Sequence, residues 1–272
     1  MRQPKERKWV KYALSLLVLG LIAASAYVVI RSTFPGEEEV YEASAKPDTA
    51  VDPEHLTNPE RFKEAYIERN GGLEHLQSLQ TLRTDGRILS KEKEVDFVVL
   101  RRRPDMMLMT QKLGRSKVTY GSKGGEHWKR ESLPGQKETV TDVAAEQIDA
   151  LTDAVEMFGP LLTAYLKEDR SVESIEQSEW EGRKALKIRI LNAEEDASDL
   201  VYVDPDDLEV IAQVTKKPEG QDIVSEFSDY KTISRVSIPF TTIVQQGDDI
   251  LSRVILEDAR FNVGASSFVF ER

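Results

Sequence analysis

The sequence contains no cysteine. A chain without cysteine cannot form a disulfide framework, a thiolate metal site or a catalytic cysteine, and no lipid can be attached through an N-terminal cysteine. The sequence also lacks the His-x-x-x-His pair, the Gly-x-Ser-x-Gly elbow and the glycine-rich phosphate loop that mark common classes of enzyme. These absences predict a protein that is not an enzyme and that uses no cofactor and no metal ion.

Basic residues are in the minority after residue 31, where 31 Lys and Arg stand against 47 Asp and Glu, a net charge of −16. A surface this acidic lacks the basic face that phosphate contact requires, which excludes nucleic acid as a partner and disfavours specific binding to anionic headgroups. Residues 31–57 hold three prolines, the acidic run Glu37–Glu39 and few large apolar residues. Such a composition cannot offset its ordering entropy by burial, so we expect a flexible linker there.

The one long apolar run lies near the N-terminus. Residues 12–30 carry no charge and are rich in Leu, Val, Ile and Ala. As a helix they would extend about 28 Å, close to the roughly 30 Å of a hydrocarbon core. The basic tail at residues 1–11 predicts a cytoplasmic N-terminus and an anchor that leaves the rest of the chain outside. The alternative is a signal peptide cleaved near Ala26, within an Ala-Ser-Ala sequence.

Residues 58–272 have the pattern of a mainly β domain with helices. Leu186, Ile188 and Ile190 alternate with basic residues, which is the period of a strand with one buried face. Turn sequences such as Asp204–Asp207 separate closely spaced strands, and this arrangement indicates an antiparallel meander. Asn58 followed by Pro59 predicts the start of a helix.

Two further stretches of this domain have their own patterns. A second helical pattern covers residues 143–166 and is broken or kinked at Gly159-Pro160. The run Arg101–Arg103 is predicted to be a solvated strand end, with an anion site as the alternative.

The order of several short motifs resembles the LolA/LolB-like proteins, the periplasmic carriers and receptors of lipoproteins. The resemblance covers roughly residues 59–270. It is carried by Tyr66-Ile67, Gly71-Gly72-Leu73, Leu82, Gly125 to Trp128, Glu181-Gly182-Arg183-Lys184, Tyr202-Val203-Asp204-Pro205, Phe227-Ser228-Asp229-Tyr230, Ile238-Pro239 and Ala259-Arg260-Phe261.

This resemblance implies an unclosed antiparallel β-barrel with helices on its concave side, where the family receives acyl chains. A barrel that does not close leaves inward apolar residues short of partners, and methylene groups can fill that space at about 0.8 kcal/mol each. The residues predicted to line such a site are apolar and aromatic; the alternative for each is ordinary core. They are Phe97, Val99, Met107, Met109, Trp128, Phe158, Leu162 and Tyr165.

The resemblance and the anchor together predict a periplasmic domain on a single-pass inner-membrane protein, or a secreted periplasmic protein if the chain is cleaved near Ala26. The predicted function is binding of lipid or lipoprotein acyl chains in envelope lipoprotein handling. Unlike the soluble carriers of the family, a tethered protein would act as a fixed acceptor, donor or sensor. The alternative is a non-enzymatic envelope scaffold or stress-sensing module that binds a protein partner.

Overall fold

The computed structural model describes residues 42–43, 55–91, 93–144, 156–167, 170–192, 198–216 and 221–272. The predicted basic tail, membrane anchor and most of the linker lie outside these residues. Among the described residues, no helix is both long enough and apolar enough to cross a membrane.

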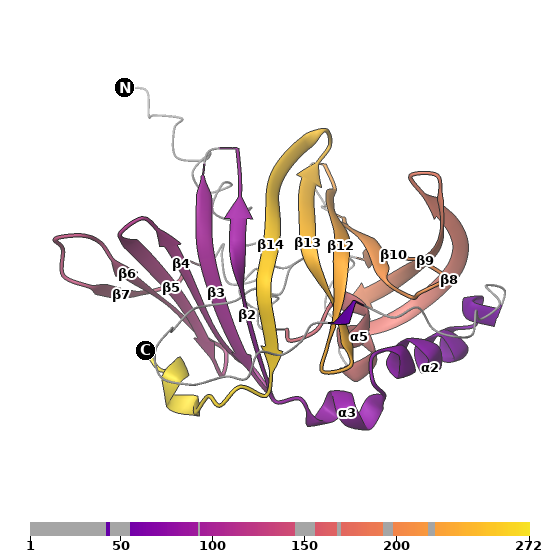
Figure 1. Cartoon of the computed structure of the whole chain (residues 1–272), viewed down its shortest axis with the longest axis horizontal. Coiled ribbons are helices and arrows are strands. Elements are labelled where there is room, and N and C mark those ends of the chain that lie inside the picture. Colours follow the sequence, from indigo (N-terminus) through magenta and orange to yellow (C-terminus); the bar gives the residue numbers. More distant parts are fainter. Residues whose placement is uncertain are drawn as a thin grey trace.

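Thirteen strands form one antiparallel sheet in the order β7-β6-β5-β4-β3-β2-β14-β13-β12-β11-β10-β9-β8 (Figure 1). One half consists of β2 (Thr81–Leu89), β3 (Glu94–Arg102), β4 (Met106–Leu113), β5 (Ser116–Lys123), β6 (Glu126–Ser132) and β7 (Thr139–Asp142). The other half consists of β8 (Arg170–Trp180), β9 (Arg183–Asn192), β10 (Ser198–Val203), β11 (Val210–Thr215), β12 (Ile223–Ile233), β13 (Val236–Gln246) and β14 (Asp249–Phe261). A two-residue strand, β1 (Glu42–Ala43), pairs with β12 outside this order.

The sheet is curved but not closed. β7 and β8 are its two edges, and these edges do not pair with each other in the described part of the chain. β2 and β14, which are far apart in the sequence, join the two halves by antiparallel pairing from Leu89–Arg253 to Leu82–Phe261. The predicted mainly β class and unclosed antiparallel sheet are therefore confirmed.

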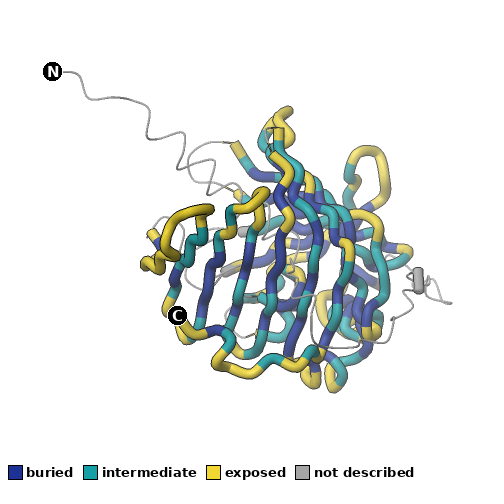
Figure 2. The backbone as a smooth tube through the Cα atoms, turned by 60° about the vertical axis from the view of Figure 1, so that its left-hand side comes forward, coloured by how far each residue is buried: buried dark blue, intermediate teal, exposed yellow. Residues whose placement is uncertain are grey.

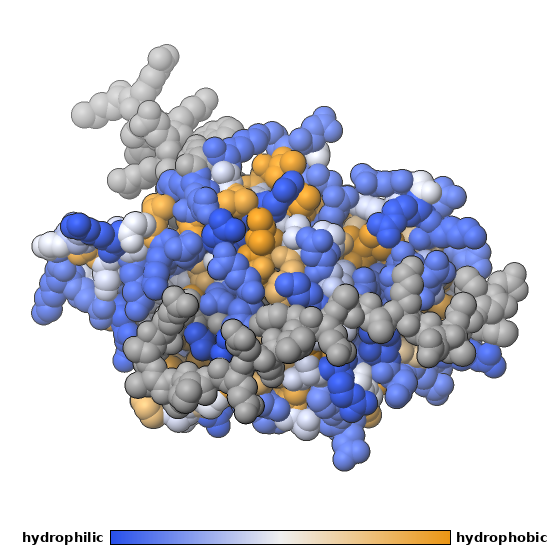
Figure 3. Space-filling model, viewed as in Figure 1, coloured by the Kyte–Doolittle hydropathy of each residue, from blue (hydrophilic) through white to orange (hydrophobic). Residues whose placement is uncertain are grey.

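Alternation of apolar and polar residues accounts for the strands. Along β13, buried residues alternate with partly exposed ones from Val236 to Val244, as expected when one face of a strand covers a core. Figure 2 shows the same alternation of buried and less buried positions along neighbouring strands. The face seen in Figure 3 is mostly hydrophilic, with apolar residues in separate patches.

The helices are short, and three of them lie against the sheet or at its end: α2 (Pro59–Arg69), α3 (Leu73–Ser78) and α5 (Pro160–Leu166). As predicted, α2 begins after Asn58, whose Oδ1 accepts a hydrogen bond from the Arg61 amide at 3.1 Å. It ends where Gly71 adopts a φ of 97°, a backbone conformation that favours glycine.

The predicted helical segment over 143–166 is described only in part. Residues 145–155 lie outside the described residues. Residues 156–159 are not helical, and α5 begins at Pro160, which agrees with the predicted break at Gly159-Pro160. Two short 3₁₀ helices, η1 (His55–Thr57) and η3 (Ser267–Phe270), complete the described elements.

Candidate functional site

Four of the predicted lining residues lie together on the concave face of β3 and β4. Val99 is paired with Met109 and Arg101 with Met107, so these side chains share one face of the sheet. Phe97, Val99, Met107 and Met109 are each at most 1% exposed and belong to the main hydrophobic core. They are packed against other side chains, and none of the four lines the cavity described below.

Residues 156–166, called the plug segment here, cover the concave face beside the other half of the sheet. The Phe158 ring lies 6.1 Å from that of Phe261 on β14. The Tyr165 ring lies 6.2 Å from that of Tyr66 and 6.4 Å from that of Phe62, both on α2. These contacts join α5, α2 and the sheet into one aromatic core.

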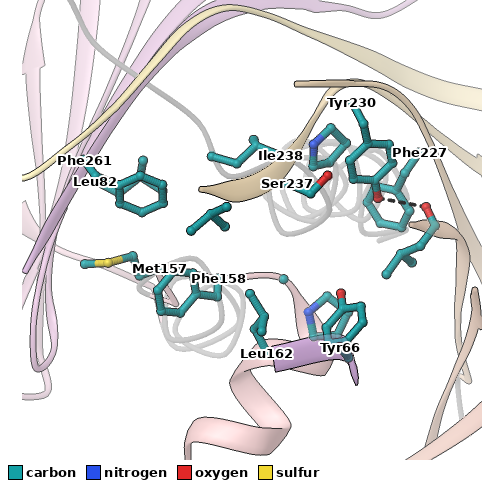
Figure 4. A pocket seen from close by; sticks show the side chains of 15 residues that line it. Tyr66, Leu82, Met157, Phe158, Leu162, Phe227, Tyr230, Ser237, Ile238 and Phe261 are labelled. Carbon is teal, nitrogen blue, oxygen red and sulfur yellow. Dashed lines mark hydrogen bonds between the residues drawn. The ribbon is translucent and has the colours of Figure 1, made fainter. Parts of the chain in front are cut away.

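A small inner cavity remains between the plug segment and the sheet. Its volume is about 60 Å³, which is enough for a few water molecules. Figure 4 shows residues of α2 and the plug segment facing residues of β12 and β13 across this space. The lining is Tyr66, Leu82, Met157, Phe158, Gly159, Pro160, Leu162, Val210, Phe227, Tyr230, Val236, Ser237, Ile238, Pro239 and Phe261.

The structure brings only part of the predicted lining to this cavity. Phe158 and Leu162 line it, and Tyr165 packs beside it against Tyr66. The lining residues that were not predicted come mainly from the motifs that carry the LolA/LolB resemblance: Tyr66, Leu82, Phe227, Tyr230, Ile238, Pro239 and Phe261. The same motifs that suggested the fold therefore also marked the cavity.

Trp128 was predicted to line the concave side, and the structure places it on the opposite face. Met109 is paired with Tyr120, and the next residue, Gly121, is paired with Trp128. Because successive residues of a strand point to opposite faces, Trp128 cannot share a face with Met109. The C-terminal segment lies on this second face, where Arg102 donates a hydrogen bond to the Ala265 carbonyl and Phe270 is fully buried.

Arg101 corrects a second prediction. It was expected at a solvated strand end, yet it is only 2% exposed and lies on the concave face between Leu82 and Met107. Burial lowers the pKa of Arg101 to about 10, and the nearby Glu156 acts in the opposite direction. The guanidinium therefore remains charged at neutral pH inside the apolar core.

Tyr66 and Tyr230 give the cavity phenol hydroxyl groups, and Tyr165 packs beside it against Tyr66. Burial raises the pKa of Tyr66, Tyr165 and Tyr230 above the ordinary value for a phenol. They are therefore neutral hydrogen-bond donors at physiological pH. The Tyr230 hydroxyl donates to the Val210 carbonyl at 2.8 Å, and the Ser237 amide, two residues before Pro239, is held by the side chain of Asn70 at 3.1 Å.

The site offers an apolar surface with a few hydroxyl groups. Among the described residues, no cluster of three or more His, Cys, Asp or Glu could hold a metal ion. The chemistry available here is burial of apolar groups and hydrogen bonding to a polar group at the edge of the cavity.

No family model matches the sequence, and no curated protein matches it. Solved structures are similar in fold. A DUF1329 family protein from Desulfovibrio piger has a TM-score of 0.55 at 12% identity, covering 79% of this chain and 98% of the other. A LolA superfamily protein from Nitrosomonas europaea has a TM-score of 0.52 at 10% identity, covering 77% of this chain and 97% of the other. At such identities the similarity concerns the fold alone, and the chain has a LolA-like fold.

Proposed function

We propose that this protein binds an acyl chain of a lipid or lipoprotein between the concave face of its sheet and the plug segment. The observation that carries this proposal is the apolar inner cavity, which lies at the junction of the plug segment, α2 and the sheet. The LolA-like fold supports it, because one similar structure is named as a LolA superfamily protein. The proposal is of a binding protein and not an enzyme.

The way in which the plug segment is held supports this role. Several hydrogen bonds of the plug segment join residues of the segment to one another or to its C-cap, Lys167. The Thr163 hydroxyl donates to the Phe158 carbonyl, the Thr163 amide donates to the Gly159 carbonyl, and the Lys167 ammonium pairs with Glu156. Phe158 and Leu162 contact the sheet through apolar and aromatic groups, whereas the charge of Glu156 acts on the buried Arg101. An acyl chain can replace the contacts of Phe158 and Leu162, because methylene groups offer the same kind of surface, while Glu156 stays near Arg101.

The cavity must enlarge before an acyl chain can enter. Sites for small molecules usually have volumes of about 300–1,000 Å³, whereas the inner cavity has about 60 Å³. Displacement of Phe158 and Leu162 from the sheet would open the space that they now fill. We therefore propose that binding of an acyl chain displaces these two side chains.

The small cavity also favours a second candidate function. A concave face that its own side chains fill needs no ligand, and the domain would then recognise a protein partner in the cell envelope. The acidic surface suits a basic partner.

Native mass spectrometry of the full-length protein in a mild detergent tests the first function. We expect copurified lipid on the natural chain and several-fold less on Leu162→Trp, because the larger side chain fills the inner cavity. Leu73→Trp is the matched control, since Leu73 is exposed and does not line the cavity. Equal lipid on all three proteins, or none on any of them, would favour the protein-binding candidate.

We further propose that residues 12–30 hold the domain at the outer side of the inner membrane, in the periplasm. The uncharged run and the basic tail before it support this placement. Gel mobility of the protein from membranes, beside full-length and Ala26-truncated standards, tests it. Comigration with the shorter standard would instead show that the segment is a cleaved signal peptide.

A further inference from the structure

Strand pairing along one edge of β12 is interrupted in the middle. Near its start, β12 pairs with β11 from Ile223 to Glu226. Near its end, it pairs with β1 at Lys231 and Thr232. Between these two stretches, residues 227–230 have no strand partner on this edge among the residues that the structure describes. Among the described residues, the wall of the sheet therefore has a break between β11 and β1.

A second space lies at this break. It is an outer hollow of about 190 Å³, lined by Arg183, Asp204, Asp207, Glu209, Val210, Ile211 and all four residues of 227–230. The end of β11 and the unpaired stretch of β12 thus form two of its walls. Unlike the inner cavity, its lining includes several charged side chains.

The outer hollow and the inner cavity share one wall. Val210, Phe227 and Tyr230 line both spaces. The Tyr230 hydroxyl reaches across the break and donates to the Val210 carbonyl at 2.8 Å, drawn as a dashed line in Figure 4. The preceding residue, Asp229, has a φ of 55°, a conformation that costs a non-glycine residue of order 1 kcal/mol or more. The wall between the two spaces therefore consists of Val210, Phe227 and Tyr230, and the Tyr230 side chain is the part of it that bridges the gap in the sheet.

We propose that this break is a side portal through which an acyl chain reaches the inner cavity, that Tyr230 is its gate, and that the polar end of the ligand, neutral or cationic, stays in the outer hollow. This inference rests on the proposed lipid-binding function. Joined, the two spaces amount to about 250 Å³ before the room vacated by the Tyr230 ring is added. That total approaches the lower end of the usual range for ligand sites, which neither space reaches alone.

The charged side chains around the outer hollow determine which charge the polar end of the ligand can carry. Four carboxylates line it, from Asp204, Asp207, Glu209 and Asp229, against the single guanidinium of Arg183. Arg183 already pairs with Asp204 at 3.1 Å, and Arg69, which lies beside the lining, pairs with Glu209 at 3.6 Å, so the carboxylates still outnumber the guanidinium groups. An added anion would meet net negative charge, whereas an ammonium group or an uncharged headgroup would not. The portal therefore selects against fatty acids and phosphate monoesters.

The absence of native cysteine makes a specific test possible. Cysteines at Ile211 and Ser228, on the two sides of the break, are joined with a short bismaleimide to close the portal. The matched control joins Ser228→Cys to Thr241→Cys, which are paired neighbours on β12 and β13 and leave the portal open. The full-length protein in neutral detergent is exposed to dodecylamine with a diazirine at the end of its chain, and labelled peptides are mapped by mass spectrometry.

We expect labelling of the cavity residues Leu82 and Phe261 in the natural chain and in the control pair, and a several-fold loss when Ile211 and Ser228 are joined. Tyr230→Phe removes the hydroxyl that bridges the break, so labelling should rise roughly two- to tenfold, the population change that corresponds to one net hydrogen bond. The dodecanoate form of the probe should label less than the amine.

Undiminished labelling after the portal is closed would overturn the inference, and so would labelling of the cavity in none of the proteins. Equal labelling by the amine and the carboxylate would overturn the assignment of the polar end. If labelling is undiminished after the portal is closed but lipid still copurifies with the natural chain, the portal inference fails and the proposed lipid-binding function stands. Failure of the inference can therefore be distinguished from failure of the proposed function.

Discussion

The two halves of the sheet use similar apolar residues to different effect (Figure 1). In the half from β2 to β7, the concave face is filled by side chains such as Phe97 and Met109, which are almost wholly buried. In the half from β8 to β14, the aromatic side chains of Phe227 and Tyr230 do not fill the concave side completely. They border both the inner cavity and the outer hollow. Apolar content alone therefore does not determine where a sheet leaves space.

Backbone conformation distinguishes the halves more clearly. Six non-glycine residues with a φ between 45° and 64° occur among the described residues, and all lie between Glu181 and Asn262. Two of them, Leu208 and Asp229, lie next to strands that border the break. Such conformations are costly and persist where the surrounding structure requires them, often at functional sites. The irregular half is thus the half that carries the candidate site.

Truncation of one phenylalanine in each half tests this contrast most strongly. Phe97→Ala should lower the free energy of unfolding by about 3–5 kcal/mol, because it leaves a cavity in a tightly packed region. Phe227→Ala should cost less, since its ring already borders two spaces and has fewer contacts to lose. Urea unfolding of the full-length protein in detergent measures both.

Phe268→Ala serves as the control for this pair. Phe268 is 71% exposed, so its removal should change stability by no more than about 0.5 kcal/mol. Equal losses for Phe97 and Phe227 would mean that the two halves are packed alike.

A smaller effect is expected at Gly121, on the convex side of the packed half. A Cβ atom there would lie 2.1 Å from the Trp128 ring, so Gly121→Ala should cost about 1–3 kcal/mol through overpacking. Lipid content should not change, because Trp128 faces away from the cavity. Gly264→Ala is the matched control, since Gly264 is exposed, does not line the cavity, and a Cβ there meets no described atom within 4 Å. Loss of lipid in Gly121→Ala would show that the two faces are coupled.

The smallest effect concerns the seam between the halves, where Asp85 on β2 is paired with Asp258 on β14. Burial and, to a lesser degree, the charge of Glu257 raise the pKa of Asp85 to about 7, while Arg260 opposes the shift. Between about pH 4 and pH 7, Asp85 is therefore protonated in the folded chain and ionised in the unfolded chain. The free energy of unfolding falls as pH rises through this range, because the folded state binds the extra proton.

Asp85→Asn should reduce this fall, because an amide does not titrate. Urea unfolding of both proteins at about pH 5 and about pH 8 measures the difference. The same fall in the variant would assign the pH dependence to other groups. Asp96→Asn, at an exposed position of β3 for which no comparable burial exists, is the control.

Much of the fold follows from local sequence patterns. The alternation around Leu186–Ile190, the Asn58-Pro59 helix start and the interruption at Gly159-Pro160 all appear in the structure. These features depend on neighbouring residues, so one sequence is sufficient to predict them. The short motifs that resemble LolA/LolB-like proteins indicated the fold that the solved structures share.

The site was harder to predict because it depends on contacts between distant elements. Met107 and Met109 are apolar and close in the sequence, yet they fill core, because both pack into the main hydrophobic core and Met109 lies between Val99 and Tyr120. The alternation of Trp128 relative to Gly121 decides its face, and this requires the register between strands. The break beside Tyr230 arises because β11 begins at Val210 whereas β12 continues to Ile233, a difference in length that no local pattern shows.

The pairing of β1 with β12 has a mechanical consequence. Tension on the chain at Glu42 and Ala43 would act directly on the edge of β12, next to the residues that border the gap. Release of these two pairs would expose the edge of β12 beside Tyr230. The proposed membrane anchor and the proposed portal would thereby be mechanically coupled.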